Sequence, residues 1–96
     1  MIKYEIYLGL NDKDTHKQEV TDETAMLLIK KLFEYVTISE LKGFYKGELE
    51  KSLKLEFIGE VRDRVELLKK VEKLKSAFNQ ECILLTETIL NDMKFI

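Results

Sequence analysis

The residues best suited to chemistry lie together in one short segment. They are four carboxylates and one histidine: Asp12, Asp14, His16, Glu19 and Glu23. Aspartates at relative positions one and three, with a glutamate at position twelve, are the spacing of a calcium-binding loop. The sixth position, which should be glycine, is Lys17, and a lone histidine beside carboxylates is an incomplete transition-metal site. We therefore expect a solvated loop that binds no metal.

Cys82 is the single cysteine and His16 the single histidine. A cysteine nucleophile needs a base within hydrogen-bond reach, so these two side chains would have to meet in the fold. A cysteine at the start of a strand is usually a small buried hydrophobic residue, and we expect that of Cys82. The sequence has no serine nucleophile elbow, phosphate loop or dinucleotide fingerprint. We predict no catalytic residue and no cofactor.

Tyr7, Phe44 and Tyr45 could form a platform that stacks on nucleic-acid bases. Sheets that do this carry a glycine–aromatic run on the third strand, whereas residues 53–58 read Leu-Lys-Leu-Glu-Phe-Ile. The net charge of −2 gives no attraction to nucleic acid or to an acidic membrane. No apolar run approaches the roughly 18–20 residues of a membrane span. We expect neither kind of partner.

The elements that position these residues follow from hydrophobic periodicity. Alternation over residues 2–10 predicts a strand with one buried face. Thr21 suits the N-cap of a helix, because its hydroxyl can accept a hydrogen bond from the first turn. An apolar stripe over residues 25–33 follows at helical spacing, with Leu27 on the opposite side.

The middle of the chain predicts a β-hairpin. Residues 35–46 have an irregular strand pattern, in which Gly43 indicates a bulge. Residues 47–50 can turn the chain, and clean alternation over residues 53–58 predicts the returning strand.

A second helix and a last strand complete the pattern. Asp63, with an acidic residue three positions later, resembles the capping box at the start of a helix. Asn79 suits the left-handed residue that ends this helix, and Cys82 begins the last predicted strand. This order is that of the split βαβ unit, so we predict an α+β protein of the ferredoxin-like βαββαβ class. Right-handed crossovers place the first and third strands at the centre and both helices on one face of a four-stranded antiparallel sheet. Residues 1–96 then form one domain whose other sheet face is open.

Several short stretches resemble an uncharacterised family of small bacterial α+β proteins, a domain of unknown function. These stretches are residues 4–10, 20–23, 43–46, 50–52 and 78–83. Phe44 and Tyr45 stand where that family tends to have one Trp, and Asn79 replaces a glycine but still permits a left-handed backbone. Many members carry an export signal that this sequence does not show. The resemblance implies the same fold and no established activity.

Four polar residues match the pattern of this family: Glu50, Ser52, Gln80 and Glu81. Gln80 and Glu81 follow a helix end, where polar side chains often bond to free backbone groups. A polar cluster that joins the hairpin to this point is one interpretation. A ligand pocket is the other, and these four are our candidate ligand-binding residues.

The lack of a catalytic constellation and the open sheet face favour a small binding module over an enzyme. With 45% apolar and 35% charged residues and one cysteine, the chain fits a globular protein of the reducing cytoplasm. Small acidic proteins of this kind often come from phages or plasmids and inhibit host factors, so a host protein is a candidate partner, and a small ligand is the alternative. A cofactor-free oxygenase or isomerase of the dimeric α/β-barrel type is the competing hypothesis, with Tyr7, His16 and Tyr45 as its polar groups. A closed apolar cavity would favour the enzyme and a filled core the binding module.

We also expect a homodimer. The open sheet face leaves Tyr7 and Ile58 beside solvent on the two central strands, and Leu27 lies on the polar side of the first helix. Charged residues on the same sheet face could pair across a two-fold axis: Lys3, Glu5, Lys54 and Glu56. The competing interpretation is that these charges keep the sheet of a monomer hydrated.

Overall fold

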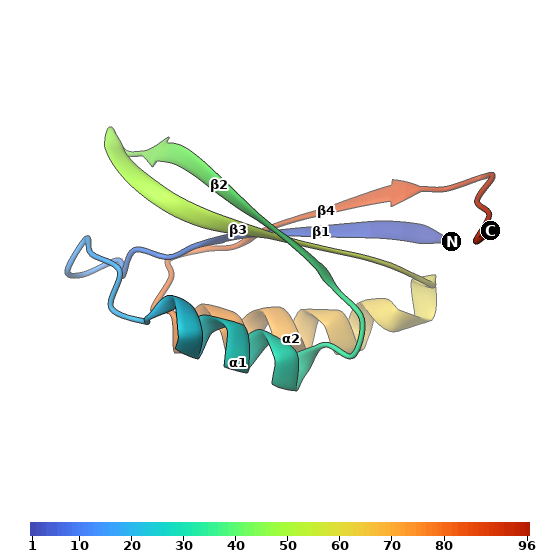
Figure 1. The fold of residues 1–96 in the computed structure, drawn as a ribbon, viewed down its shortest axis with the longest axis horizontal. Coiled ribbons are helices and arrows are strands. Elements are labelled where there is room, and N and C mark those ends of the chain that lie inside the picture. The colour runs from blue at the N-terminus through green and yellow to red at the C-terminus, as the bar shows by residue number, and fades with distance from the viewer.

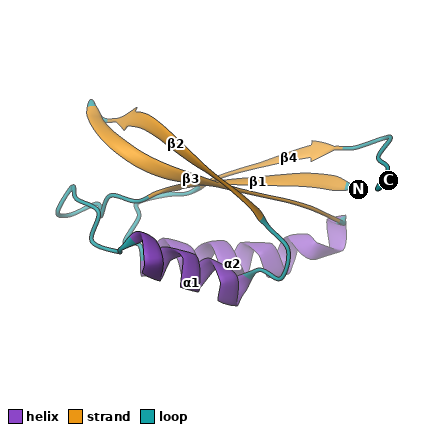
Figure 2. Ribbon diagram, viewed as in Figure 1, coloured by secondary structure: helices purple, strands orange, loops and turns teal.

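Four strands and two helices follow one another in the predicted order in the computed structural model, which describes residues 1–96. The elements are β1 (Ile2–Gly9), α1 (Asp22–Leu32), β2 (Thr37–Tyr45), β3 (Glu48–Gly59), α2 (Arg64–Ala77) and β4 (Leu84–Ile89). The strands form one antiparallel sheet in the order β2-β3-β1-β4. Both helices cover the same face of this sheet (Figures 1 and 2). The predicted ferredoxin-like α+β sandwich is confirmed, and neither helix has the length and apolar character needed to cross a membrane.

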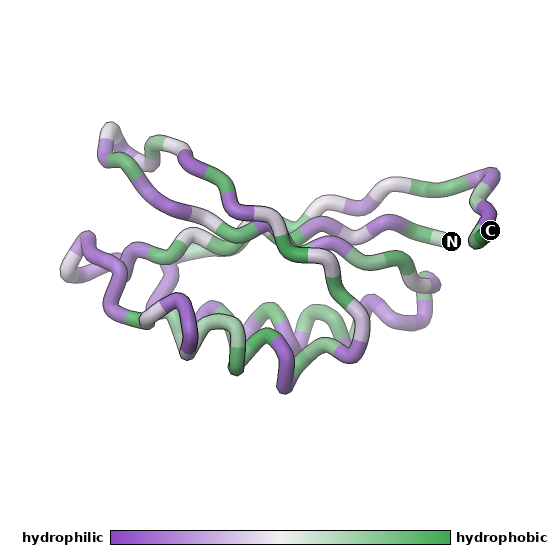
Figure 3. Tube along the Cα trace, in the orientation of Figure 1, coloured by the Kyte–Doolittle hydropathy of each residue, from purple (hydrophilic) through white to green (hydrophobic).

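The core lies between the sheet and the two helices. Every second residue of β1 is buried, as the alternation predicted, and the colour of the chain varies accordingly along this strand (Figure 3). Its buried residues pack in one hydrophobic cluster with residues of both helices. Of the 15 buried residues, 14 form a hydrophobic core that includes Ala25 and Ile29 of α1 and Phe33 at its C-cap, and the other is Gly59. Thr21 accepts a hydrogen bond from the backbone N–H of Thr24 at 3.2 Å, which confirms the predicted N-cap.

The hairpin differs from the prediction in two ways. No bulge occurs at Gly43, which pairs with Glu50 in an unbroken register. The turn is the tight pair Lys46–Gly47, with φ of 51° and 81°, so that β3 begins already at Glu48. Positive φ at both positions matches the twist of antiparallel strands, and glycine adopts it without steric cost.

The second half of the chain also shifts by a few residues. Asp63 caps a 3-10 turn instead of α2, since its Oδ2 accepts from the backbone N–H of Glu60 at 2.7 Å. β4 ends at Ile89 because its partner β1 begins at Ile2, and no pairing strand lies beyond. Arg64 at the start of α2 donates two hydrogen bonds to the Glu87 carboxylate, at 2.7 and 2.8 Å, which joins β4 to the helical layer.

Candidate functional site

An open groove of about 440 Å³ lies at the end of the sheet where β1 stops and the β2–β3 hairpin turns. We call it the Glu50 groove. Its floor includes Tyr7 and Gly9 of β1 and the residues that face them on neighbouring strands, Leu84 and Ser52. Its walls are the loop that follows β1, the tip of the hairpin, and the connection from α2 to β4. The hairpin curves away from the helices here (Figure 1). Tyr7 and Gly9 alternate with the buried residues of β1, so the groove lies on the face of the sheet that the helices leave uncovered.

All four candidate ligand-binding residues line this groove: Glu50, Ser52, Gln80 and Glu81. Their contacts divide them into two pairs. Gln80 donates from Nε2 to the backbone oxygen of Asn11 at 2.5 Å, and Glu81 accepts from the Tyr45 hydroxyl at 2.8 Å. These two therefore hold the walls together. Ser52 has no side-chain hydrogen bond and Glu50 has one, so both remain able to contact a ligand; that they do so stays a prediction.

The Glu50 carboxylate is held against the backbone of β1. The backbone N–H of Asn11 donates to Oε2 of Glu50 at 2.9 Å. A Cβ at position 9 would lie 2.5 Å from Oε1 of the same carboxylate, so only glycine leaves room for this contact. Oε1 has no hydrogen-bond partner in the protein, and no cationic side chain pairs with Glu50. The result is a half-buried, oriented carboxylate with one oxygen free.

The carboxylates on the hairpin side have partners of their own. Glu81 accepts from Lys46 Nζ at 3.2 Å as well as from Tyr45, and the Tyr45 and Lys46 hydrogen bonds hold the pKa of Glu81 below its usual range. Glu48 Oε2 lies 3.0 Å from Nδ1 of His16. These contacts join the tip of the hairpin to two other walls of the groove.

Asp12 organises the loop after β1. Its Oδ1 accepts from the backbone N–H groups of Asp14 and Thr15, at 2.8 and 3.1 Å, and from the side-chain amide of Asn79 at 3.0 Å. The backbone bond from Asp14 is the largest cause that lowers the pKa of Asp12, followed by the bond from Asn79. No three metal-ligating side chains converge on one point in this structure.

Left-handed backbone is concentrated around the Glu50 groove. The three non-glycine residues with positive φ are His16 (61°), Lys46 (51°) and Asn79 (47°). His16 and Lys46 line the groove, and Asn79 precedes the lining residue Gln80. Such residues carry strain and tend to cluster at ligand sites. The asparagine was expected from the end of its helix, but no local pattern pointed to His16 or Lys46.

The groups considered for an enzyme, Tyr7, His16 and Tyr45, also line the groove, and each contacts a carboxylate. The Tyr7 hydroxyl donates to Glu5 at 3.0 Å, and this bond is the main cause that raises the pKa of Tyr7. Tyr45 likewise has a raised pKa because it donates to Glu81. The groove is open, and most of its lining residues are polar, whereas a closed apolar cavity would favour the enzyme. Cys82 is exposed on the rim of the groove, so the prediction of a buried cysteine is wrong. The residue precedes β4 and therefore does not pack into the core beneath the sheet.

The charge of the lining is negative. Four carboxylates face two lysines, Lys13 and Lys46, and His16 is the only other ionisable nitrogen. The aromatic lining residues are Tyr7, Phe44 and Tyr45. Lys46 Nζ already lies 5.3 Å from the centre of the Tyr45 ring, so this ring accepts a cation. Acidic and aromatic groups together favour a cationic ligand with a flat or apolar part.

The predicted dimer residues lie on two surfaces. Tyr7 and Ile58 are on the central strands of the open face, and Ile58 is 37% exposed. Leu27, 58% exposed, is on α1. The neighbouring charges pair within the sheet, where Glu5 lies 3.7 Å from Lys3 and 3.8 Å from Lys54. Dimer formation stays a prediction.

The fold and the groove define a class of protein: a ferredoxin-like sandwich with a recessed acidic site on the open face of its sheet. No family model and no curated protein matches the sequence. Solved structures do match. A phage SAM lyase in complex with S-methyl-5'-thioadenosine has a TM-score of 0.67 and 17% identity, covering 91% of this chain and 79% of that one.

Two further structures show the same architecture. A DUF3240 family protein from Shewanella baltica has a TM-score of 0.64 and 10% identity, over 99% of this chain and 96% of the other. The de novo designed protein Foldit4 has a TM-score of 0.55 and 10% identity, over 94% and 98%. At these identities the likeness shows the fold alone. A designed protein with the same fold illustrates that function has to be argued from the site.

Proposed function

We propose that this chain is a binding module whose Glu50 groove holds a small cationic ligand. The observation that carries the proposal is the Glu50 carboxylate, which is oriented by Asn11 and Gly9 but has no cationic partner. Withdrawing a charged carboxylate from water is unfavourable unless an opposite charge or several hydrogen bonds compensate. A ligand cation at the free Oε1 provides that compensation.

The aromatic lining supports a ligand with a flat ring beside its charge. The ring faces of tyrosine and phenylalanine attract cations and stack on heterocycles. Tyr7 and Tyr45 are also oriented by their hydrogen bonds to Glu5 and Glu81, so they lose little freedom when a ring packs on them. Ser52 adds a hydroxyl between this lining and Glu50 along β3.

We infer that the ligand is an adenosine that bears a sulfonium group, as in SAM (S-adenosylmethionine). A neighbour of the same fold is named as a SAM lyase and holds S-methyl-5'-thioadenosine. The adenine ring suits the aromatic lining, and the positive sulfur suits Glu50. This step rests on analogy of fold together with the charge of the groove.

Calorimetric titration with two matched ligands tests the proposal. SAM and S-adenosylhomocysteine differ by one methyl group and its positive charge. We expect SAM to bind roughly two- to fivefold more tightly, which is the usual range for one partly exposed charge pair. Glu50→Gln should remove this preference, while Glu72→Gln, on the exposed side of α2, should retain it. Thermal melting checks that both variants fold.

Several outcomes would contradict the proposal. Equal affinity for the two ligands, or a preference that survives in Glu50→Gln, would show that Glu50 does not recognise the charge. Absence of binding by either ligand at millimolar concentration would remove this ligand class. Chromatography of SAM after incubation would reveal products if the chain were an enzyme instead of a binding module.

A further inference from the structure

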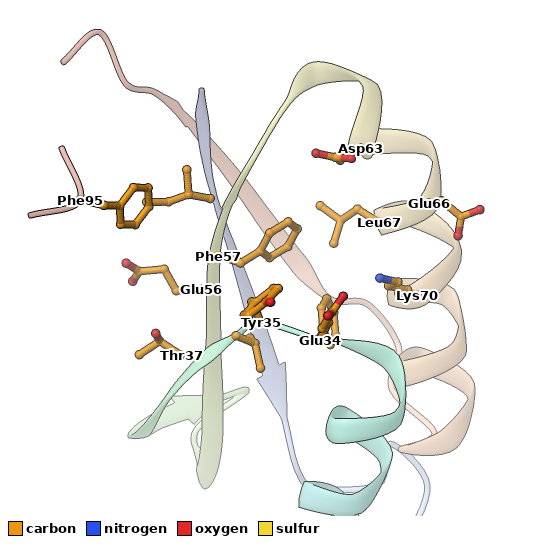
Figure 4. Close-up of a pocket in the computed structure, with 13 residues that line it drawn as sticks. Glu34, Tyr35, Thr37, Glu56, Phe57, Asp63, Glu66, Leu67, Lys70 and Phe95 are labelled. Atoms are coloured by element: carbon orange, nitrogen blue, oxygen red, sulfur yellow. The ribbon is translucent and has the colours of Figure 1, made fainter. Parts of the chain in front are cut away.

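A second groove lies at the other end of the sheet, between the α1–β2 connection, the end of β3 and the start of α2 (Figure 4). We call it the Tyr35 groove; its volume is about 880 Å³. The rings of Phe33 and Phe57 lie 5.9 Å apart at its base, where Leu67 also contributes. The base is therefore continuous with the hydrophobic core.

Two aromatic residues on the sides of the groove are left in solvent. Tyr35 is 79% exposed and Phe95 is 85% exposed. Neither ring makes an aromatic contact, and the Tyr35 hydroxyl has no hydrogen bond. Large aromatic side chains in this state are typical of contact surfaces, because their burial against a partner releases much water at little cost in conformational entropy.

The rim of the groove is acidic. Its carboxylates are Glu34, Glu56, Asp63 and Glu66. The single cation of the lining, Lys70, lies 5.1 Å from the centre of the Phe33 ring. Glu34 has no ion pair or hydrogen bond, and Glu66 pairs only with exposed Lys69 at 3.5 Å. Glu34 and Glu66 are therefore available to form ion pairs with a positively charged partner.

We propose that the Tyr35 groove docks a basic segment of a partner protein. One large apolar side chain of that segment fits between Tyr35 and Phe95, and its lysines or arginines face Glu34 and Glu66. Apolar anchors in a groove with charged residues at its rim are a common mode of peptide recognition. The charge also disfavours two other occupants. A nucleic acid would bring phosphates to an acidic rim, and a second copy related by a two-fold axis would bring the same four carboxylates against themselves.

This surface is separate from the Glu50 groove. Glu50 and Phe57 are seven positions apart along β3, a distance of about 23 Å in an extended strand. Binding at one groove can therefore fail without affecting the proposal for the other.

Three short synthetic peptides of one length test the docking proposal. The first has lysines on both sides of a central phenylalanine, the second has glutamates in place of the lysines, and the third has serine in place of the phenylalanine. Fluorescence anisotropy of labelled peptides is measured against the full chain and four variants. Tyr35→Ser and Glu34→Lys change the groove. Leu49→Ser, 61% exposed near the hairpin tip and in neither groove, and Glu72→Lys are the matched controls.

We expect only the first peptide to bind, with an affinity that falls as salt concentration rises. Tyr35→Ser should weaken it roughly tenfold, as loss of an interface anchor does, and Glu34→Lys roughly threefold. The two controls should change the affinity little. Absence of binding at millimolar peptide overturns the proposal, and so does equal binding of the acidic peptide. A dimer of the wild type that Tyr35→Ser dissociates, as measured by light scattering, also overturns the proposal, because a second copy of the chain would then occupy the groove.

Discussion

Gly9 and Glu50 should be energetically coupled, because a side chain at position 9 cannot coexist with the observed carboxylate. In Gly9→Ala the new methyl group would lie 2.5 Å from Oε1, 2.7 Å from Cδ and 2.8 Å from Oε2 of Glu50. Position 9 is extended strand, so alanine adopts its backbone without strain. Glu50 is half-buried and can rotate into solvent. What the substitution removes is the hydrogen bond from the Asn11 N–H.

The size of the coupling follows from two opposing effects. A hydrogen bond to a carboxylate at a half-exposed site contributes about 1 kcal/mol to the free energy of unfolding. Alanine in a strand is more favourable than glycine by roughly 0.5–1 kcal/mol. Gly9→Ala alone should therefore be nearly neutral, and Glu50→Ala should cost about 1 kcal/mol. In the Glu50→Ala background, Gly9→Ala should stabilise the protein, which gives a coupling free energy of about 1 kcal/mol.

Urea denaturation followed by circular dichroism measures all four proteins of this cycle. Independent sites add within roughly 0.3–0.5 kcal/mol, so the expected coupling is resolvable. The same proteins, titrated with SAM, should show that Gly9→Ala loses the preference for the sulfonium ligand although its stability is unchanged. If the two stability effects simply add, the carboxylate is not held over Gly9, and the geometric basis of the Glu50 groove is refuted.

Three further predictions concern the rest of the molecule. If the open sheet face mediates the proposed dimer, light scattering should find a dimer that Ile58→Lys dissociates and that Leu27→Lys, on α1, leaves intact; a monomeric wild type contradicts this. Asp12 has a pKa below its usual value, so its stabilising effect is complete at neutral pH and is lost as the pH falls below about 4. The stability difference between wild type and Asp12→Asn should therefore close in acid, and a difference independent of pH would disprove the assignment. Calcium, zinc or manganese at micromolar concentration should leave the melting temperature unchanged, whereas a rise of several degrees would reveal a metal site that binds the native state.

The parts of the fold that the sequence predicted correctly are those with one buried face. β1 alternates because the helices cover one side of it, and the order of the elements, with right-handed crossovers, placed it at the centre of the sheet. The first residues of β3 carry no such pattern, because no helix covers the hairpin there. Their strand character was therefore missed. On α2, apolar residue type alone does not separate buried from exposed positions: Leu67 and Val71 are buried, whereas the helix turns Val65 and Leu68 toward solvent.

Sequence analysis identified residues of the candidate site but not the contact that orients Glu50. Resemblance to a family brought together Glu50, Ser52, Gln80 and Glu81, and the structure places all four in one groove. What orients Glu50 is a hydrogen bond from Asn11, 39 positions away along the chain. No local spacing reveals a contact of that kind. It depends on the register of β1 against β3, in which Gly9 faces Ser52.

Both grooves arise from a difference in length between the two layers. α1 has 11 residues and spans about 16 Å, whereas the 12 residues of β3 span about 40 Å. At the hairpin end the strands therefore extend past both helices, whereas at the other end α1 stops short and the start of α2 lies close to the end of β3 (Figure 1). Residues of the sheet that the helices cover, such as Ile6 and Leu55, are buried in the hydrophobic core. Glu50 and Tyr35 lie beyond it, so their side chains are free of that constraint, and a domain of this size can keep its core intact while both ends remain available for recognition.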